Sequence, residues 1–240
     1  MSRRLFIANH IGLGDHILCN GLYREIAKNF DVCVVPIRKS NAQAMSHMLG
    51  DLKNMRIIAY PDEYAVPMLK SHRLYLQSIG YSTLDLGYFG TNFLATGDIR
   101  FDENFYKQAG IPFDLRWSNF SFERNIDRET ELLNRLGCAS EEYIFLHEDV
   151  SRGYTIDRSR IRSQHRLIQP NPTMTEFSFF DYLSVIENAT EIHTIESSFA
   201  ALIESVGMTT PKFAHRYSRP QASSDYGHEF TYKSDWQILK

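Results

Sequence analysis

Three residues that could carry acid–base chemistry lie close together near the N-terminus, in the stretch HIGLGDHIL over residues 10–18. Asp15 follows a glycine-containing turn, with His10 and His16 on either side of it. Carboxylates and imidazoles both serve as general bases. A glycine-rich turn after a first strand is also typical of dinucleotide-binding domains, but their fingerprint needs a third glycine, and position 17 is Ile.

The position of Asp15 argues against a phosphate at this turn. Two negative charges a few ångströms apart repel strongly where the dielectric constant is low. We therefore expect the turn at Gly12 and Gly14 to present Asp15 at the carboxyl edge of a parallel sheet, where open α/β sheets bind ligands. The structural alternative is equally open: an Asp in the first turn of a helix satisfies backbone amides and the helix dipole.

A second candidate site lies in HTIESSFAALIESVG, residues 193–207. The pattern predicts a strand that ends at Glu196 and a helix that Ser197 and Ser198 open. Free amides, two hydroxyls and the positive end of the helix dipole suit a diphosphate, and no acid stands in the first turn. The alternative is that one serine only caps the helix.

An arginine-rich segment, residues 147–166, follows another predicted strand. Guanidinium groups such as those of Arg152 and Arg158 match the geometry of phosphate, so this segment could bind a phosphate group. A solvated basic loop is the alternative. His147 ends the strand and either reaches the same site or packs in the core. The remaining arginines of the segment are Arg160, Arg162 and Arg166.

Composition limits the class of protein. The 240 residues are 43% hydrophobic and 23% charged, which is ordinary for a globular protein, and the net charge of −3 disfavours nucleic acid as a partner. No apolar run approaches the roughly 18 residues of a membrane span, and the N-terminus lacks the features of a signal peptide. Three widely spaced cysteines suit a reducing compartment, and none has zinc-ligand spacing. We therefore expect a cytoplasmic protein without a metal site.

The elements that would position these residues alternate as strands and helices. This rhythm breaks over residues 97–130 and then restarts, which predicts an α/β fold with two Rossmann-like domains, 1–125 and 126–240, and a cleft between them. The tail, 218–240, is expected to be irregular, with Trp236 packing it down. Predicted strands are 4–10, 31–37, 55–60, 83–90, 142–149, 165–171, 190–196 and 211–217, and predicted helices are 15–29, 40–50, 62–80, 102–109, 129–137, 177–189 and 197–207.

Together these features resemble glycosyltransferases of the GT-B fold, and most closely the heptosyltransferase-like group. The resemblance implies that Asp15 in GLGDHI is the base that deprotonates the acceptor hydroxyl, with Gly14 and His16 on the acceptor side. It also implies that the second half binds a nucleotide-sugar. The residues implied at the donor are Arg152, Arg158, Glu196, Ser197, Ser198 and Phe199.

Two departures from that group are visible. The group usually has a later His in the second-half turn, which ESSFAAL lacks, and each half of this chain is compact for the fold. Glu196 and Glu204 also have the spacing of the Glu pair in retaining transferases, whereas a base at Asp15 indicates inversion, which we favour.

The resemblance implies an inverting, metal-independent transferase without a cofactor. It would move a sugar from a nucleotide-diphosphate donor to a glycan, lipid-linked or protein acceptor. A non-catalytic nucleotide- or glycan-binding protein of the same fold, and a nucleotide-sugar epimerase or hydrolase, remain as alternatives. An NADP-dependent oxidoreductase is least favoured, although Arg38 and Lys39 could suit a 2′-phosphate.

Overall fold

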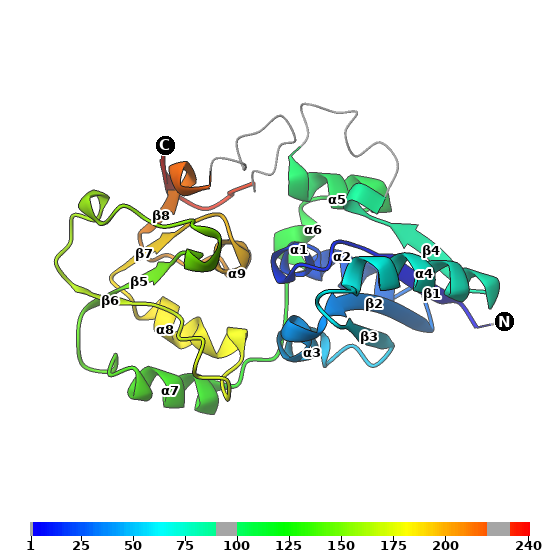
Figure 1. Cartoon of the computed structure of the whole chain (residues 1–240), viewed down its shortest axis with the longest axis horizontal. Helices are drawn as coiled ribbons and strands as arrows, with labels where there is room; N and C mark the ends of the chain where they lie inside the picture. The colour runs from blue at the N-terminus through cyan, green and yellow to red at the C-terminus, as the bar shows by residue number, and fades with distance from the viewer. Residues whose placement is uncertain (1, 90–99, 220–230) are drawn as a thin grey trace. The chain divides into compact units, whose positions relative to one another are not determined.

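The computed structural model describes residues 2–89, 100–219 and 231–240, and the chain divides after Glu123 into two compact units. Each unit contains one parallel sheet with helices packed against it (Figure 1). The α/β class expected from the sequence is confirmed. The division between the units lies two residues before the predicted boundary.

The first unit, Met1–Glu123, has a four-stranded sheet in the order β3-β2-β1-β4. The chain runs outward from β1 to β3 and then returns to place β4 on the other side of β1. The carboxyl ends of β1 and β4 therefore form a topological switch point, where doubly wound sheets bind ligands. The strands are β1 (Arg4–Ala8), β2 (Val32–Arg38), β3 (Met55–Tyr60) and β4 (Ser82–Asp85).

Helices cover both faces of this sheet. Right-handed crossovers put the β3–β4 helix on the face opposite to the helices that follow β1 and β2. This helix, α4 (Ala65–Ser78), packs its buried stripe on Phe6, Val34 and their neighbours, and Pro67 sits in its first turn, where a missing N–H is tolerated. The other helices are α1 (Leu13–Leu18), α2 (Asn20–Ala27), α3 (Ala42–Leu49), α5 (Phe101–Ala109) and α6 (Leu115–Ser118).

Two helix predictions in this unit need correction. The single helix expected over 15–29 is broken at Cys19 into α1 and α2. The side chain of Asn20, just after the break, exchanges hydrogen bonds of 3.0 Å with the backbone N–H and C=O of Ser121, a contact that helical periodicity cannot show. The helix predicted over 40–50 begins only at Ala42, because Ser40 lies in a 3₁₀ turn, η1 (Lys39–Asn41), before α3.

The second unit, Arg124–Lys240, has a five-stranded parallel sheet in the order β6-β5-β7-β8-β9. The chain again goes to one side of its first strand and then to the other, so its switch point lies between β5 and β7. The strands are β5 (Tyr143–His147), β6 (Arg166–Ile168), β7 (Glu191–Thr194), β8 (Lys212–His215) and β9 (Trp236–Leu239). The helices are α7 (Ile126–Arg135), α8 (Leu183–Glu187) and α9 (Ser198–Val206).

The end of the chain differs from the irregular tail that was predicted. Residues Trp236–Leu239 form β9, which pairs in parallel with β8. The buried carboxylate of Glu204, on α9, holds this segment: it accepts the backbone N–H of Lys233 at 2.7 Å and the indole N–H of Trp236 at 2.8 Å. A partner 32 residues away in the chain therefore fixes the last strand.

Candidate functional site

In the first unit, Asp15 lies at the switch point between β1 and β4. β1 ends at Ala8, a short loop follows, and α1 begins after Gly12, so Asp15 is the third residue of that helix. Its side chain is 21% exposed, and its Oδ1 atom lies 3.8 Å from Nδ1 of His10. A partly exposed carboxylate thus stands at the sheet edge where a ligand is expected.

The glycine before α1 allows this placement. A Cβ atom on Gly12 would lie only 2.7 Å from Oδ2 of Asp15, so the carboxylate folds back over the glycine backbone. Among the described residues, no first-turn amide donates a hydrogen bond to Asp15. The geometry therefore disfavours capping of backbone amides by Asp15, whereas its place in the first turn still suits the helix dipole.

His10 spans the two strands of the switch point. Its ring lies 5.5 Å, centroid to centroid, from the rings of both Phe101 and Phe105. It also lies against Gly87, just after β4, where an added Cβ atom would be 2.3 Å from its Nε2 atom. Gly87 has a φ of +61°, a conformation that other residues rarely adopt. His10 is therefore wedged in place beside Asp15.

His16, expected on the acceptor side, is instead an interior residue. Its side chain is wholly buried, and Nδ1 lies 2.7 Å from the hydroxyl of Tyr23. Burial lowers the pKa of His16 from 6.5 to about 4, so the ring is neutral at pH 7. Gly14 is half-buried in the first turn of α1. Of the residues expected around Asp15, the structure thus brings His10, and not His16, to its carboxylate.

In the second unit, two side chains meet across the switch point between β5 and β7. Ser197 is the N-cap of α9, and its Oγ atom accepts the N–H of Ala200 at 3.4 Å. The same Oγ atom lies 3.0 Å from Nδ1 of His147, the last residue of β5. Capping by Ser197 is confirmed, but the serine also contacts a histidine that is fifty residues away in the sequence.

His147 presents a neutral imidazole at this edge. Burial lowers its pKa from 6.5 to about 4, and its ring lies 4.6 Å from the ring of Phe199. Within residues 2–89, 100–219 and 231–240, its Nε2 atom has no hydrogen-bond partner. This atom is also not among the buried polar atoms that lack a partner, so it is accessible to solvent. Ser198 and Phe199 open α9 with no acid in its first turn. The His147–Ser197 pair was not predicted, because the sequence does not state the strand order.

The two arginines expected at the donor are held by acids of their own loop. Arg158 makes a two-pronged contact with Glu148, at 2.6 and 3.0 Å, and the guanidinium of Arg152 contacts Asp149. A phosphate would have to replace these carboxylates. Arg162 is exposed and has no polar partner in the described part of the chain.

The other residues expected at the donor, Glu196 and Phe199, have contacts within their own unit, as does Glu204. Glu196 is 1% exposed, and its Oε1 atom accepts a hydrogen bond from Nε of Arg216 at 3.1 Å. Glu204 is equally buried and binds the C-terminal segment. The two carboxylates are therefore not presented as a pair to a ligand. Phe199 is 5% exposed and packs on Phe179 in the core.

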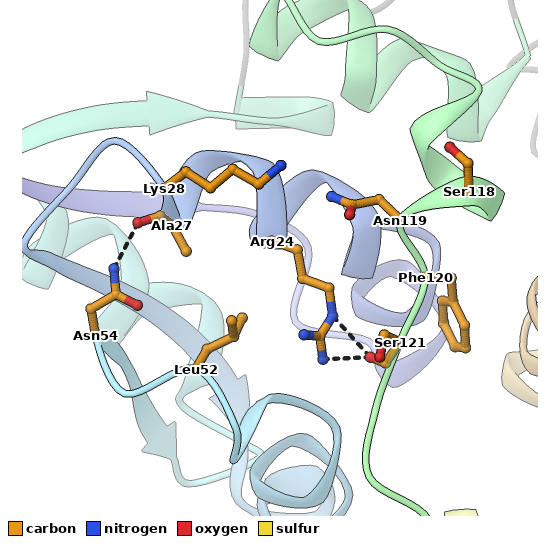
Figure 2. Close-up of a pocket in the computed structure, with 9 residues that line it drawn as sticks. All are labelled: Arg24, Ala27, Lys28, Leu52, Asn54, Ser118, Asn119, Phe120 and Ser121. Carbon is orange, nitrogen blue, oxygen red and sulfur yellow. Dashed lines mark hydrogen bonds between the residues drawn. The ribbon is translucent and has the colours of Figure 1, made fainter.

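The first unit has a surface pocket of about 430 Å³ (Figure 2), and Asp15 is not among the residues that line it. It is lined by residues just before β2 and β3, which places it at the amino edge of the sheet. Its largest polar group, Arg24, already bonds Asp51 and the carbonyl of Ser121. The lining residues are Arg24, Ala27, Lys28, Leu52, Asn54, Ser118, Asn119, Phe120 and Ser121.

The described residues contain no group of three or more His, Cys, Asp or Glu side chains that could hold a metal ion. They also include no helix with the length and apolar character needed to cross a membrane. The three cysteines are buried and unpaired.

Comparison with known proteins connects this architecture with one group. No protein-family model matches the chain, and no curated protein sequence matches it. Among solved structures, the family 9 glycosyl transferase of Veillonella parvula DSM 2008 superposes with a TM-score of 0.57 at 13% identity, over 99% of this chain and 85% of that one.

Two Escherichia coli proteins have the same architecture. The heptosyltransferase WaaC with ADP gives a TM-score of 0.52 at 12% identity, over 98% of this chain and 92% of that one. The ADP-heptose lps heptosyltransferase II gives 0.51 at 12% identity, over 99% and 92%. The chain therefore has the fold of the heptosyltransferase-like glycosyltransferases.

Proposed function

We propose that this protein is a glycosyltransferase that moves a sugar from a nucleoside-diphosphate donor to a hydroxyl acceptor, with Asp15 as the general base. The observation that carries the proposal is the Asp15 carboxylate. It stands at a switch point, partly exposed, folded over Gly12 and without a first-turn amide as partner. A nucleoside-diphosphate donor is supported by the structural neighbours, one of which contains ADP.

The transfer step follows from this arrangement. Asp15 accepts the proton of the acceptor hydroxyl while the acceptor oxygen forms a bond to the anomeric carbon of the donor sugar. The bond from that carbon to the diphosphate oxygen breaks, and its electron pair leaves with the diphosphate. One displacement of this kind inverts the configuration at the anomeric carbon, so we propose an inverting enzyme.

The diphosphate end of the donor is assigned to the start of α9. The nine-residue helix has no acid in its first turn, so its amides and dipole favour an anion there. His147 is neutral, and its open Nε2 position can donate a hydrogen bond to a phosphate oxygen when Nδ1 accepts from the hydroxyl of Ser197. These groups would stabilise the leaving diphosphate without a metal ion.

One observation favours a second candidate, a binding protein of the same fold without turnover. Arg152 and Arg158, the cations nearest in sequence to the strand end at His147, are already paired with Asp149 and Glu148. A ligand that binds through neutral hydrogen bonds alone would leave these pairs intact. Such a protein would bind a nucleotide-sugar, but it would not cleave the bond between the nucleotide and the sugar.

The Asp15→Asn variant distinguishes these functions. A panel of UDP-, GDP- and ADP-sugars first identifies the donor by calorimetry and by release of free nucleotide in the presence of mixed acceptors. Asn is almost the same size as Asp but cannot take a proton, so turnover should fall about 10²–10⁴-fold. Donor affinity and the melting temperature should stay at the parental values.

The matched control is Glu103→Gln, which removes another first-turn acid in the same unit and should retain full turnover. If Asp15→Asn turns over normally, Asp15 is not the base. If the parent binds a nucleotide-sugar and releases no nucleotide with any acceptor, the binding protein is the better description.

A further inference from the structure

One cation at the carboxyl edge of the second sheet has no carboxylate partner in the described part of the chain. Arg219 follows β8 and the 3₁₀ turn η6 (Arg216–Ser218), and its side chain is partly exposed. Its Nη1 atom donates a hydrogen bond of 2.7 Å to the backbone carbonyl oxygen of Glu196. A carbonyl group is neutral, so this bond leaves the positive charge of Arg219 uncompensated.

Three other arginines near this edge are paired with acids. Nε of Arg216 donates to the Glu196 carboxylate at 3.1 Å. Arg152 and Arg158 are paired with carboxylates of their own loop. Each of these guanidinium groups would have to give up a carboxylate before it could bind a phosphate. Arg219 has no such partner to lose, so it is the cation best suited to an incoming anion.

Two segments beside the β5–β7 switch point hold the Arg219 guanidinium. The first is the turn before α9, because the Glu196 carbonyl belongs to the peptide group that joins Glu196 to Ser197, the N-cap of that helix. The second is the loop after β5, where the centre of the Tyr154 ring lies 5.8 Å from Cζ of Arg219. Tyr154 packs on an apolar cluster that includes Ile195, just after β7. Arg219 therefore contacts both segments that are expected to surround a ligand at this edge.

We propose that Arg219 is the cation that binds the diphosphate of the donor and stabilises its negative charge as it leaves. A planar guanidinium can hold two phosphate oxygens at once, and it stays charged at physiological pH. The bond to the Glu196 carbonyl already orients the side chain, so little reorganisation is needed when charge develops on the diphosphate. Arg219 forms no covalent bond and moves no proton in this role.

This assignment rests on the proposed function, because it takes the donor diphosphate to bind at the start of α9. It divides the work between two kinds of group: neutral donors at α9 and His147 orient the diphosphate, and Arg219 supplies the opposite charge. The alternative is a purely structural role, in which Arg219 only ties the segment after β8 to the turn before α9. A neutral side chain with an N–H group could make that single bond equally well, so removal of the charge separates the two roles.

Calorimetry on the full chain with ADP, GDP and UDP, each compared with its nucleoside, tests the assignment. Arg219→Gln keeps a side-chain N–H donor and loses the charge. Its affinity for the diphosphate that the parent binds best should fall at least about tenfold, while its affinity for the corresponding nucleoside stays at the parental value. Arg219→Lys keeps the charge and should recover most of the lost affinity. Added salt should weaken diphosphate binding more in the parent than in Arg219→Gln.

The matched control is Arg56→Gln, because Arg56 is an exposed arginine of the first unit that also donates to backbone carbonyls. It should bind nucleotides as the parent does, and melting temperatures confirm that each variant folds.

Ser198→Asp tests the site itself, because it puts a negative charge in the first turn of α9. If Ser198→Asp weakens diphosphate binding and Arg219→Gln does not, the donor site stands and the assignment of Arg219 is wrong. Equal loss of diphosphate and nucleoside affinity in Arg219→Gln, or equal loss in the Gln and Lys variants, would also overturn it in favour of the structural role. If the parent binds none of the three diphosphates, the proposed donor class fails and the assignment fails with it.

Discussion

Glu204 offers the sharpest test of how the second unit is held together. Its Oε1 atom accepts the backbone N–H groups of Lys233 and Ser234, at 2.7 and 3.3 Å. Its Oε2 atom accepts the hydroxyl of Ser234 at 2.6 Å and the indole N–H of Trp236 at 2.8 Å. The carboxylate is 1% exposed and anchors the segment that leads into β9. We therefore assign Glu204 to the fold and not to sugar chemistry.

The substitution Glu204→Gln shows how much this carboxylate contributes to the free energy of unfolding. The amide keeps one acceptor oxygen, and its NH₂ group is best placed toward Ser234, whose hydroxyl can rotate to accept. The indole N–H of Trp236 then has no acceptor, which costs about 1–3 kcal/mol. The remaining bonds also lose their charge assistance, which adds about 1 kcal/mol. The expected loss in the free energy of unfolding is about 2–4 kcal/mol.

Urea denaturation at pH 7 measures this loss, and limited trypsin digestion after Lys233 reports whether the tail detaches before the unit unfolds. Glu142→Gln is the matched control, because the Glu142 side chain is 74% exposed and should change stability little. An unchanged urea midpoint and unchanged cleavage in Glu204→Gln would refute the anchoring role. If that same variant lost transferase turnover, Glu204 would belong to the chemistry after all.

Three further predictions concern the first unit. Gly12→Ala should fold normally but lose turnover at least about tenfold, because its Cβ atom displaces the flexible end of Asp15; a parental rate would refute the placement of that carboxylate. Asp102→Ala should cost about 3–5 kcal/mol in urea, since it leaves the wholly buried Arg116 without its carboxylate, and a smaller loss would mean that the pair is solvated. Burial lowers the pKa of His16 from 6.5 to about 4. As the pH falls through that window, His16 becomes protonated in the unfolded chain before it does in the folded chain. The free energy of unfolding should therefore drop by about 3 kcal/mol between pH 6.5 and 4. Urea titrations across this range should show a shallower drop in His16→Gln.

The sequence predicts those elements whose signal is local. VCVVPI, residues 32–37, is an apolar β-branched run, and such runs form strands that are buried on both faces of a parallel sheet. The serine turn at the start of α9 was found for the same reason, because a cap and the helix that it opens are adjacent in the chain. Local patterns thus place most strands and the start of α9.

The features that were missed depend on partners far away in the chain. β9 forms because Glu204 binds the tail, and the polar residues between them gave no strand signal. Gly21, just after the break between α1 and α2, allows the chain at Leu115 to approach closely, because a Cβ atom on Gly21 would lie 2.0 Å from the carbonyl oxygen of Leu115. His16 has helical spacing on the same side as the apolar residues of α1, so its burial could have been predicted from periodicity.

Strand order explains why the most informative contact was not predicted. His147 and Ser197 meet because β5 and β7 are neighbours, and this neighbourhood follows from the order β6-β5-β7-β8-β9 and not from the residues themselves. Once it is known that β6 is added on one side of β5 and β7 on the other, the carboxyl ends of β5 and β7 become the expected ligand edge. A polar residue at each of those two ends is then the signal to look for.

The two switch points have the same topology and opposite electrostatics, and this difference is the basis for assigning their roles. At the first, Asp15 is an acid without an amide partner, which disfavours a diphosphate, so we propose that a hydroxyl group binds and loses its proton there. At the second, Ser197 and the start of α9 offer hydrogen-bond donors and the positive end of a dipole, beside a histidine that burial keeps neutral. An anion is therefore favoured only at the second unit. We propose that Asp15 at one edge, and Ser197, His147 and the start of α9 at the other, decide which ligand each edge takes.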